Sequence, residues 1–142
     1  MKKEKSKTTK VYLNRELKRF RNKALKLWKL VVKKRAGNKC EYCGSKEMIQ
    51  AHHVENYMTN KFLRYSVENS MVLCPTHHKW GKYSAHKSFA FTYEIMTTRY
   101  KDRQYILDHC NNNIEWTKEN LLNKIKELEE ELNGTGSKIK TG

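Results

Sequence analysis

Two pairs of metal-binding side chains, far apart along the chain, place the strongest constraint on its fold. Cys40 and Cys43 are separated by two residues, and so are Cys74 and His77. Two short pairs from separate segments are the usual source of the four ligands of a tetrahedral zinc ion. One metal bound by all four would hold the two segments together. We therefore expect the central part of the chain to fold around a structural zinc.

This part of the chain contains more ligands than one zinc site can use. The additional histidines are His52, His53, His78 and His86. Neighbouring residues of a strand point to opposite faces, so His52 and His53 cannot both bind one metal in a regular strand. The surplus indicates a second, open metal site. An open metal beside a neutral histidine that serves as general base suits the hydrolysis of a phosphodiester.

The charge of the chain is concentrated before the metal-binding motifs. The net charge of the 142 residues is +15, and residues 1–39 hold 16 of the 30 Lys and Arg but only two of the 15 acidic residues. Such asymmetry is typical of a protein that binds a polyanion, and we expect nucleic acid. A solvated basic face and an anionic membrane surface are the alternatives. Because there is no apolar run of about 20 residues and no secretory segment, we expect a soluble cytoplasmic protein that does not use a membrane.

Hydrophobic periodicity predicts an α+β fold that is mostly helical. Apolar residues recur every three or four positions from about Asn14 to Arg35, which indicates an amphipathic helix with a basic outer face. Residues 1–10 are polar and are expected to be disordered. The other expected elements are strands at 48–54 and 70–73 with a loop at 55–69, a helix beginning near Pro75, a helix from Ser84 to about Tyr100 with Phe89, Tyr93 and Met96 facing inward, and a final helix after Thr117 that ends at Gly134.

The order of these residues resembles the HNH, or ββα-metal, nuclease family. The matching positions, in chain order, are Cys40-x-x-Cys43, His52-His53, Glu68-Asn69-Ser70-Met71-Val72-Leu73-Cys74 and His77-His78. The match covers roughly residues 38–90 and joins a zinc-knuckle core to His, Asn and His in the family's order. The fuller run, which includes His86, is similar to small HNH proteins common in phage genomes.

The resemblance implies a role for each matching position. His52 and His78 would bind a catalytic divalent metal, and His53 would be the general base that activates water. Asn69 would orient the imidazole of His53 through a hydrogen bond. His86 would be a third ligand of this metal, a phosphate contact or a structural histidine.

The chain departs from the family pattern at two positions. His77 stands where the family often has a fourth cysteine of the zinc site. Because His77 and His78 are adjacent, their roles can be exchanged, and we prefer His77 on the zinc since it keeps the two-residue spacing. His52 stands where a carboxylate is common. A neutral ligand leaves more charge on the metal and suits Zn²⁺, Mn²⁺, Co²⁺ or Ni²⁺ alongside Mg²⁺.

The resemblance implies a metal-dependent endonuclease that nicks or cleaves DNA, which we expect to be double-stranded. It divides the chain into a disordered basic tail with a basic helix (1–37), a nuclease core (38–100), a C-terminal helical segment (101–133) and a disordered tail (134–142). The expected DNA contacts are Arg64 and Lys61 near the scissile phosphate and, on the basic helix, Lys18, Arg19, Lys26 and Lys29. The alternative is a noncatalytic zinc-finger protein that binds nucleic acid. The protein is expected to act either as a monomer or as a homodimer.

Overall fold

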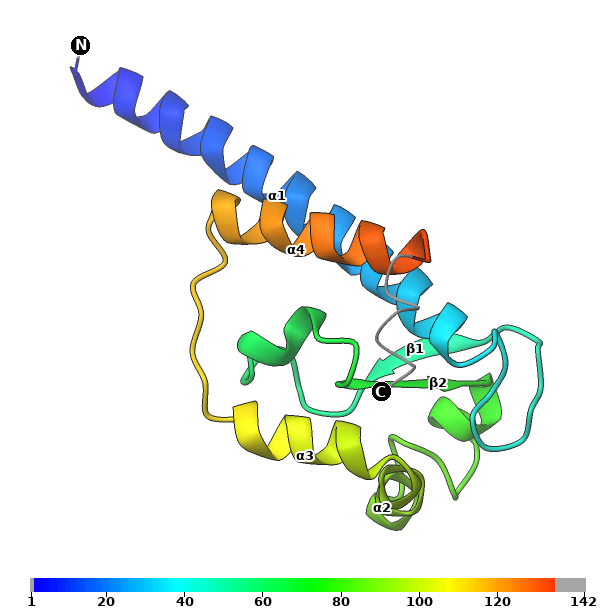
Figure 1. Cartoon of the computed structure of the whole chain (residues 1–142). Helices are drawn as coiled ribbons and strands as arrows, with labels where there is room; N and C mark the ends of the chain where they lie inside the picture. The colour runs from blue at the N-terminus through cyan, green and yellow to red at the C-terminus, as the bar shows by residue number, and fades with distance from the viewer. Residues whose placement is uncertain (1, 135–142) are drawn as a thin grey trace. The chain divides into compact units, whose positions relative to one another are not determined.

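The computed structural model describes residues 2–134 as a mostly helical α+β fold with one two-stranded sheet, which confirms the mostly helical α+β part of the predicted fold class (Figure 1). The elements in chain order are α1 (Lys2–Arg35), β1 (Gln50–His53), the 3-10 turn η1 (Phe62–Tyr65), β2 (Ser70–Leu73), the π-type turn η2 (Thr76–Trp80), α2 (Phe89–Thr98), α3 (Tyr100–His109) and α4 (Lys118–Leu132). None of the helices in the described range is both long and apolar enough to cross a bilayer.

The chain divides into two compact units. One comprises Met1–Leu27 with Glu115–Gly142, and the other comprises Trp28–Ile114. In the first unit, ion pairs Glu16–Lys118 (2.9 Å) and Lys23–Glu129 (3.3 Å) show that α1 and α4 run parallel. The second unit contains every metal ligand expected from the sequence and is the part that positions the site.

Helix α1 is longer than its apolar pattern predicts. It includes residues 2–10, which were expected to be disordered, and it ends at Arg35 as expected. The segment from 2 to 35 has no Gly or Pro and is rich in Lys, so a helix begun on the apolar stripe can extend through it. Gly37, with φ of 74°, stops it in the left-handed conformation that glycine favours. Of the expected tail at 134–142, Gly134 ends the described structure, and residues 135–142 lie outside it.

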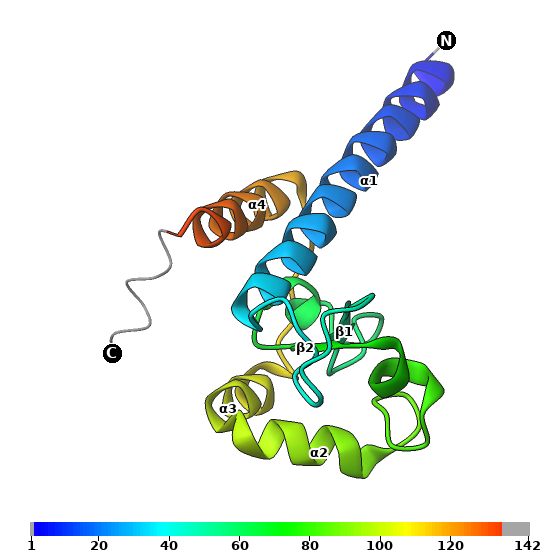
Figure 2. The ribbon, with the colours of Figure 1, turned by 90° about the vertical axis from the view of Figure 1, so that its right-hand side faces the viewer.

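The register of the antiparallel sheet decides what each histidine of β1 faces. His52 is paired with Met71, and His53 is paired with Ser70. Paired residues share a face of the sheet and neighbours alternate. His52 therefore lies on the face of Met71, which is covered by α2 and α3, whereas His53 lies on the face covered by residues 28–35 of α1 (Figures 1 and 2).

Helix α2 begins later than the sequence predicts and buries a different face. Its N-cap is Ser88, whose hydroxyl accepts the backbone N–H of Phe91 at 3.3 Å, and not Ser84. Phe91, Ile95 and Met96 are buried, as are Leu63, Met71 and Leu73, which belong to the same core. Of the three residues expected to face inward, Met96 is buried, but Phe89 and Tyr93 are exposed. The helix starts later because the residues before Ser88 form a turn that is joined to η2 by backbone hydrogen bonds.

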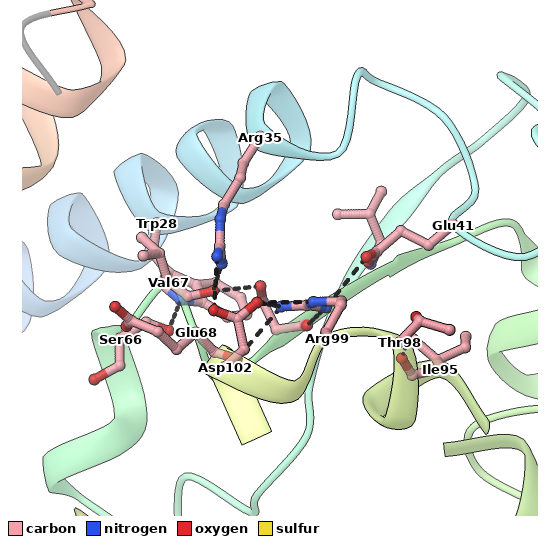
Figure 3. Close-up of polar contacts among 12 residues, drawn as sticks. Trp28, Arg35, Glu41, Ser66, Val67, Glu68, Ile95, Thr98, Arg99 and Asp102 are labelled. Carbon is pink, nitrogen blue, oxygen red and sulfur yellow. Dashed lines mark hydrogen bonds and ion pairs between the residues drawn. The ribbon is translucent and has the colours of Figure 1, made fainter. Parts of the chain in front are cut away.

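A network of charged side chains around Arg99 joins the segments of the second unit (Figure 3). Arg99 donates to Asp102 at 2.9 Å and to Glu41 at 3.1 Å. Arg35, at the end of α1, also donates to Asp102, at 2.7 Å. Glu41 lies inside the first metal-ligand pair, and its other carboxylate oxygen accepts the backbone N–H of Val72 at 2.6 Å. Partly buried charges that satisfy one another in this way hold the first ligand pair against β2.

Candidate functional site

Three thiols and one imidazole converge in what we call the thiol cluster: Cys40, Cys43, Cys74 and His77. Their ligand atoms all lie within 4.8 Å of one another. The Sγ atoms of Cys43 and Cys74 are 3.8 Å apart, and His77 Nδ1 is 3.3 Å from Cys74 Sγ and 3.8 Å from Cys40 Sγ. Around a tetrahedral zinc, two sulfurs are about 3.8 Å apart and a sulfur and a nitrogen are about 3.6 Å apart. The four side chains could therefore hold a metal ion such as zinc.

The chemistry of Cys40 suits metal binding at neutral pH. Burial acts to raise the pKa of this thiol, but backbone N–H groups of Cys43, Cys74 and Tyr42 act against it and lower the pKa to about 7. The thiolate is the form that binds zinc. All four cysteines of the chain are free thiols, so no disulfide competes for these sulfurs.

The tight turn after β2 sends two adjacent histidines to different places. In η2 the N–H of Gly81 donates to the carbonyl of Thr76 at 2.8 Å, a π-type hydrogen bond. A Cβ at Gly81 would lie 2.9 Å from that carbonyl oxygen, so the turn needs glycine there. His77 enters the thiol cluster and His78 does not, which is the assignment preferred from the spacing.

The second group of ligands, the histidine cluster, consists of His52 from β1, His78 from η2 and His86 from the turn before α2. Their ligand nitrogens lie within 4.8 Å of one another. His78 Nε2 is 3.2 Å from His52 Nδ1 and 3.0 Å from His86 Nε2. Nitrogens bound to one metal at about 2.1 Å lie roughly 3.0–3.4 Å apart, so the three could share a metal. Three protein ligands would leave further positions open to water and substrate.

Burial and crowding keep the imidazoles of His52 and His78 neutral. Burial is the main cause that lowers the pKa of His52 to about 3 and that of His78 to about 4, and the neighbouring imidazoles add to it. A neutral imidazole is the form that binds a metal. His86 reaches the cluster because two backbone hydrogen bonds join its turn to η2, from Ala85 to His77 at 2.9 Å and from His86 to His78 at 3.1 Å.

Gln50 supports the histidine cluster, and the sequence reasoning missed it. Its Oε1 lies 2.5 Å from Nδ1 of His78. An amide oxygen only accepts, so Nδ1 carries the proton and Nε2 of His78 presents its lone pair to the cluster. The sequence could have predicted this role from the position of Gln50 in the expected strand. Gln50 precedes His52 by two residues, and strand residues two apart share a face.

Replacing Gln50 with Ala is expected to weaken binding of a divalent ion at the histidine cluster by about 10- to 100-fold, as is usual when a partner of a metal-ligating histidine is lost. Gln50→Glu should retain affinity, because a carboxylate also accepts from Nδ1. Isothermal titration with Mn²⁺ or Ni²⁺ measures the change, and the ¹⁵N shifts of His78 report its tautomer. Equal affinity in the wild type and Gln50→Ala, with the tautomer unchanged, would contradict this role.

His53 is held as a neutral imidazole of one orientation. Its ring stacks on the buried Trp28, with centroids 4.0 Å apart and planes 4° from parallel. Nε2 is 2.8 Å from the carbonyl oxygen of Arg64, so Nε2 carries the proton and Nδ1 keeps the free electron pair. Burial is the main cause that lowers the pKa of His53, and the nearby cations Arg64 and Lys29 act in the same direction.

Asn69 does not orient His53 in the way expected. Its buried amide accepts the N–H of Glu55 at 2.6 Å and donates to the carbonyls of Glu55 and Leu63, both at 3.1 Å. These backbone groups satisfy the amide, and no hydrogen bond to His53 is formed within residues 2–134. Glu55 is two residues after His53, and Leu63 is the residue before Arg64. The hydrogen bonds of Asn69 therefore fix the two backbone segments that are joined by the His53–Arg64 hydrogen bond.

The cations expected to bind DNA have different environments. The guanidinium of Arg64 lies 5.1 Å from the ring centroid of Tyr57, and its Nε is buried with no hydrogen-bond partner among the described residues. Lys61 is exposed just before η1. The four cations of α1 that were expected to contact DNA are all exposed: Lys18, Arg19, Lys26 and Lys29. His109 belongs to neither cluster: its Nδ1 donates to the carbonyl of Tyr105 at 2.7 Å.

The chain matches no protein family, no curated protein and no solved structure. The features of the chain that bear on its function are the two clusters, the orientation of His53 and the distribution of charge.

Proposed function

We propose that the protein is a metal-dependent endonuclease of the HNH, or ββα-metal, type that hydrolyses DNA phosphodiester bonds. The observation that carries the proposal is the state of His53, a neutral imidazole with a fixed tautomer in the residue next to His52 of the histidine cluster. In this proposal the thiol cluster holds a structural zinc, and the histidine cluster holds a catalytic divalent ion, one of Mg²⁺, Mn²⁺, Ni²⁺, Co²⁺ or Zn²⁺. A noncatalytic zinc-finger protein would need only the thiol cluster and would have no use for the histidine cluster.

The side chains around His53 suggest how the proton moves. His53 would take a proton from water at Nδ1, because Nε2 donates to the Arg64 carbonyl. That carbonyl would then face an imidazolium and stabilise it. The Arg64 guanidinium, whose Nε lacks a partner in the described structure, would bind a phosphate oxygen. A divalent ion at the histidine cluster would supply positive charge for the phosphate and the leaving oxygen.

A plasmid assay tests the proposal. Supercoiled DNA is incubated with the zinc-loaded protein in Mg²⁺, Mn²⁺ or Ni²⁺, and nicked and linear products are separated on a gel. We expect products with the wild type and with His109→Ala, a histidine outside both clusters, but not with His78→Ala, which lacks the central ligand of the histidine cluster. A wild type that is inactive with every metal but binds DNA tightly would instead support a noncatalytic zinc-finger protein.

The basic face of α1 is proposed to bind the phosphate backbone. Replacing Lys18, Arg19, Lys26 and Lys29 with Ala is expected to weaken binding to a DNA duplex and to reduce the slope of log affinity against log salt by about 0.9 for each lost phosphate contact. The matched control, with the same change in net charge, replaces four exposed cations elsewhere: Lys46, Lys101, Arg103 and Lys126. Fluorescence anisotropy at several salt concentrations measures both slopes, and equal slopes for the two variants would contradict a role for this face.

A further inference from the structure

The segment that carries His86 places two large aromatic side chains in water. Trp80 is 76% exposed and Phe89 is 84% exposed. Trp80 follows His78 by two residues and Phe89 follows His86 by three, so both are close in sequence to ligands of the histidine cluster. The ammonium of Lys87 donates to the carbonyl of Trp80 at 3.3 Å, which brings the two ends of this segment together. Trp80 and Phe89 are the two most exposed aromatic side chains among the described residues, and aromatic rings are enriched at binding surfaces.

The segment that carries these two rings is also rich in lysine. Lys79, Lys82 and Lys87 are exposed in the same segment. The acidic side chain nearest in sequence, Glu94, accepts a hydrogen bond from the hydroxyl of Tyr83. We call the following six residues the aromatic–basic surface: Lys79, Trp80, Lys82, His86, Lys87 and Phe89. Its composition complements a strand that offers phosphates together with the faces of unstacked bases.

Duplex DNA offers phosphates but keeps its bases stacked, so lysines alone would suffice to bind it. Aromatic rings interleaved with cations are the usual means of binding single strands, because each unpaired base can stack on a ring. The surface is also rigid where it meets the histidine cluster, since backbone hydrogen bonds join residues 85 and 86 to residues 77 and 78. A rigid stacking surface loses little entropy when a base binds.

We infer that the aromatic–basic surface binds unpaired bases of a nucleic-acid strand, and that the substrate therefore has a single-stranded segment beside the phosphate that is cleaved. The second part of this inference rests on the proposed function, whereas the binding of unpaired bases does not. Trp80 and Phe89 stack on bases, and the three lysines bind the phosphates between them.

Binding is tested with labelled 20-nucleotide dT and U strands and with a 20-base-pair duplex, by fluorescence anisotropy of the zinc-loaded protein at one salt concentration. Trp80→Ala and Phe89→Ala are each expected to weaken binding of a single strand by roughly 5- to 100-fold and to leave duplex binding within about twofold. The matched control is Tyr100→Ala, an aromatic residue that is 61% exposed and stands beyond the opposite end of α2. Unchanged melting temperatures verify that the variants are folded.

The emission of Trp80 gives an independent measurement. Of the three tryptophans, Trp28 and Trp116 are buried, so stacking of a base should quench mainly Trp80. Quenching by dT or U strands in the wild type but not in Trp80→Ala supports the inference, and the comparison of the two strands distinguishes DNA from RNA. If both variants bind single strands as tightly as Tyr100→Ala does, the surface serves another partner, such as a protein, and the inference is wrong.

Cleavage separates this inference from the proposed function. If unpaired bases bind at Trp80 and Phe89 but no substrate is cleaved with any metal, the binding of unpaired bases stands and the proposed function fails. If a fully paired duplex is cleaved as fast as one with a single-stranded segment, and Trp80→Ala affects both equally, the proposed function stands and the second part of the inference, a substrate with a single-stranded segment, is wrong.

Discussion

Replacing Cys74 with Ser is expected to abolish zinc binding at the thiol cluster and to unfold the unit formed by residues 28–114. Binding of zinc to such ligand sets contributes on the order of 10 kcal/mol or more to folding. At about 0.1 kcal/mol per residue, a unit of this length is stabilised by roughly 9 kcal/mol in total. The loss therefore matches or exceeds the whole stability. Cys40 and Cys74 are also part of the hydrophobic core, so a metal bound by them would form its site together with the core.

The measurements for this prediction are the zinc content and the thermal unfolding followed by circular dichroism. Cys110→Ser is the matched control, because Cys110 is a partly buried free thiol that lies outside both clusters. It should retain one zinc per chain and melt within a few degrees of the wild type. A Cys74→Ser protein that still melts cooperatively near the wild-type temperature would show that the core does not depend on the metal.

The spacing of the cysteines was sufficient to predict the thiol cluster, for a local reason. Cys40-x-x-Cys43 and Cys74-x-x-His77 each form one turn, and a turn brings its two ligands together whatever the rest of the chain does. The opposite orientation of His52 and His53 was predictable on the same basis, because alternation is a property of any strand. The register, which pairs His52 with Met71, adds only on which of the two faces of the sheet each histidine lies.

The partners of these histidines were not predictable, because they depend on contacts between distant segments. Asn69 fits the family pattern, yet its hydrogen bonds to Glu55 and Leu63 follow from how the chain passes between β1 and β2. His86 was left with three possible roles, because its place in the histidine cluster depends on two backbone hydrogen bonds to η2. The start of α2 was misplaced for a related reason, since Ser84 and Ser88 are equally good caps by residue type.

Replacing His53 with Ala is expected to reduce the rate of DNA cleavage by about 10²- to 10⁴-fold, the usual contribution of a general base. Affinity for DNA should change little, because His53 is half-buried against Trp28 and contributes no charge at neutral pH. The substitution leaves a space beside Trp28 and the Arg64 carbonyl. Added imidazole can enter this space, so partial recovery of cleavage in His53→Ala, but not in His78→Ala, would identify the lost group as a base.

The pH dependence of cleavage tests the same assignment. A base works only when unprotonated, and burial lowers the pKa of His53 below its ordinary value of 6.5. The wild-type rate should therefore decline at a lower pH than a base with the ordinary pKa of 6.5 would give, and His53→Ala should lack this decline. Protonation of His52 or His78 would also reduce the rate, by displacing the metal. That effect would move to lower pH when more metal is added, whereas a decline caused by His53 would not move. If the decline in rate shifts with metal concentration and persists in His53→Ala, it is caused by protonation of the metal ligands. The role of His53 as the general base would then be contradicted.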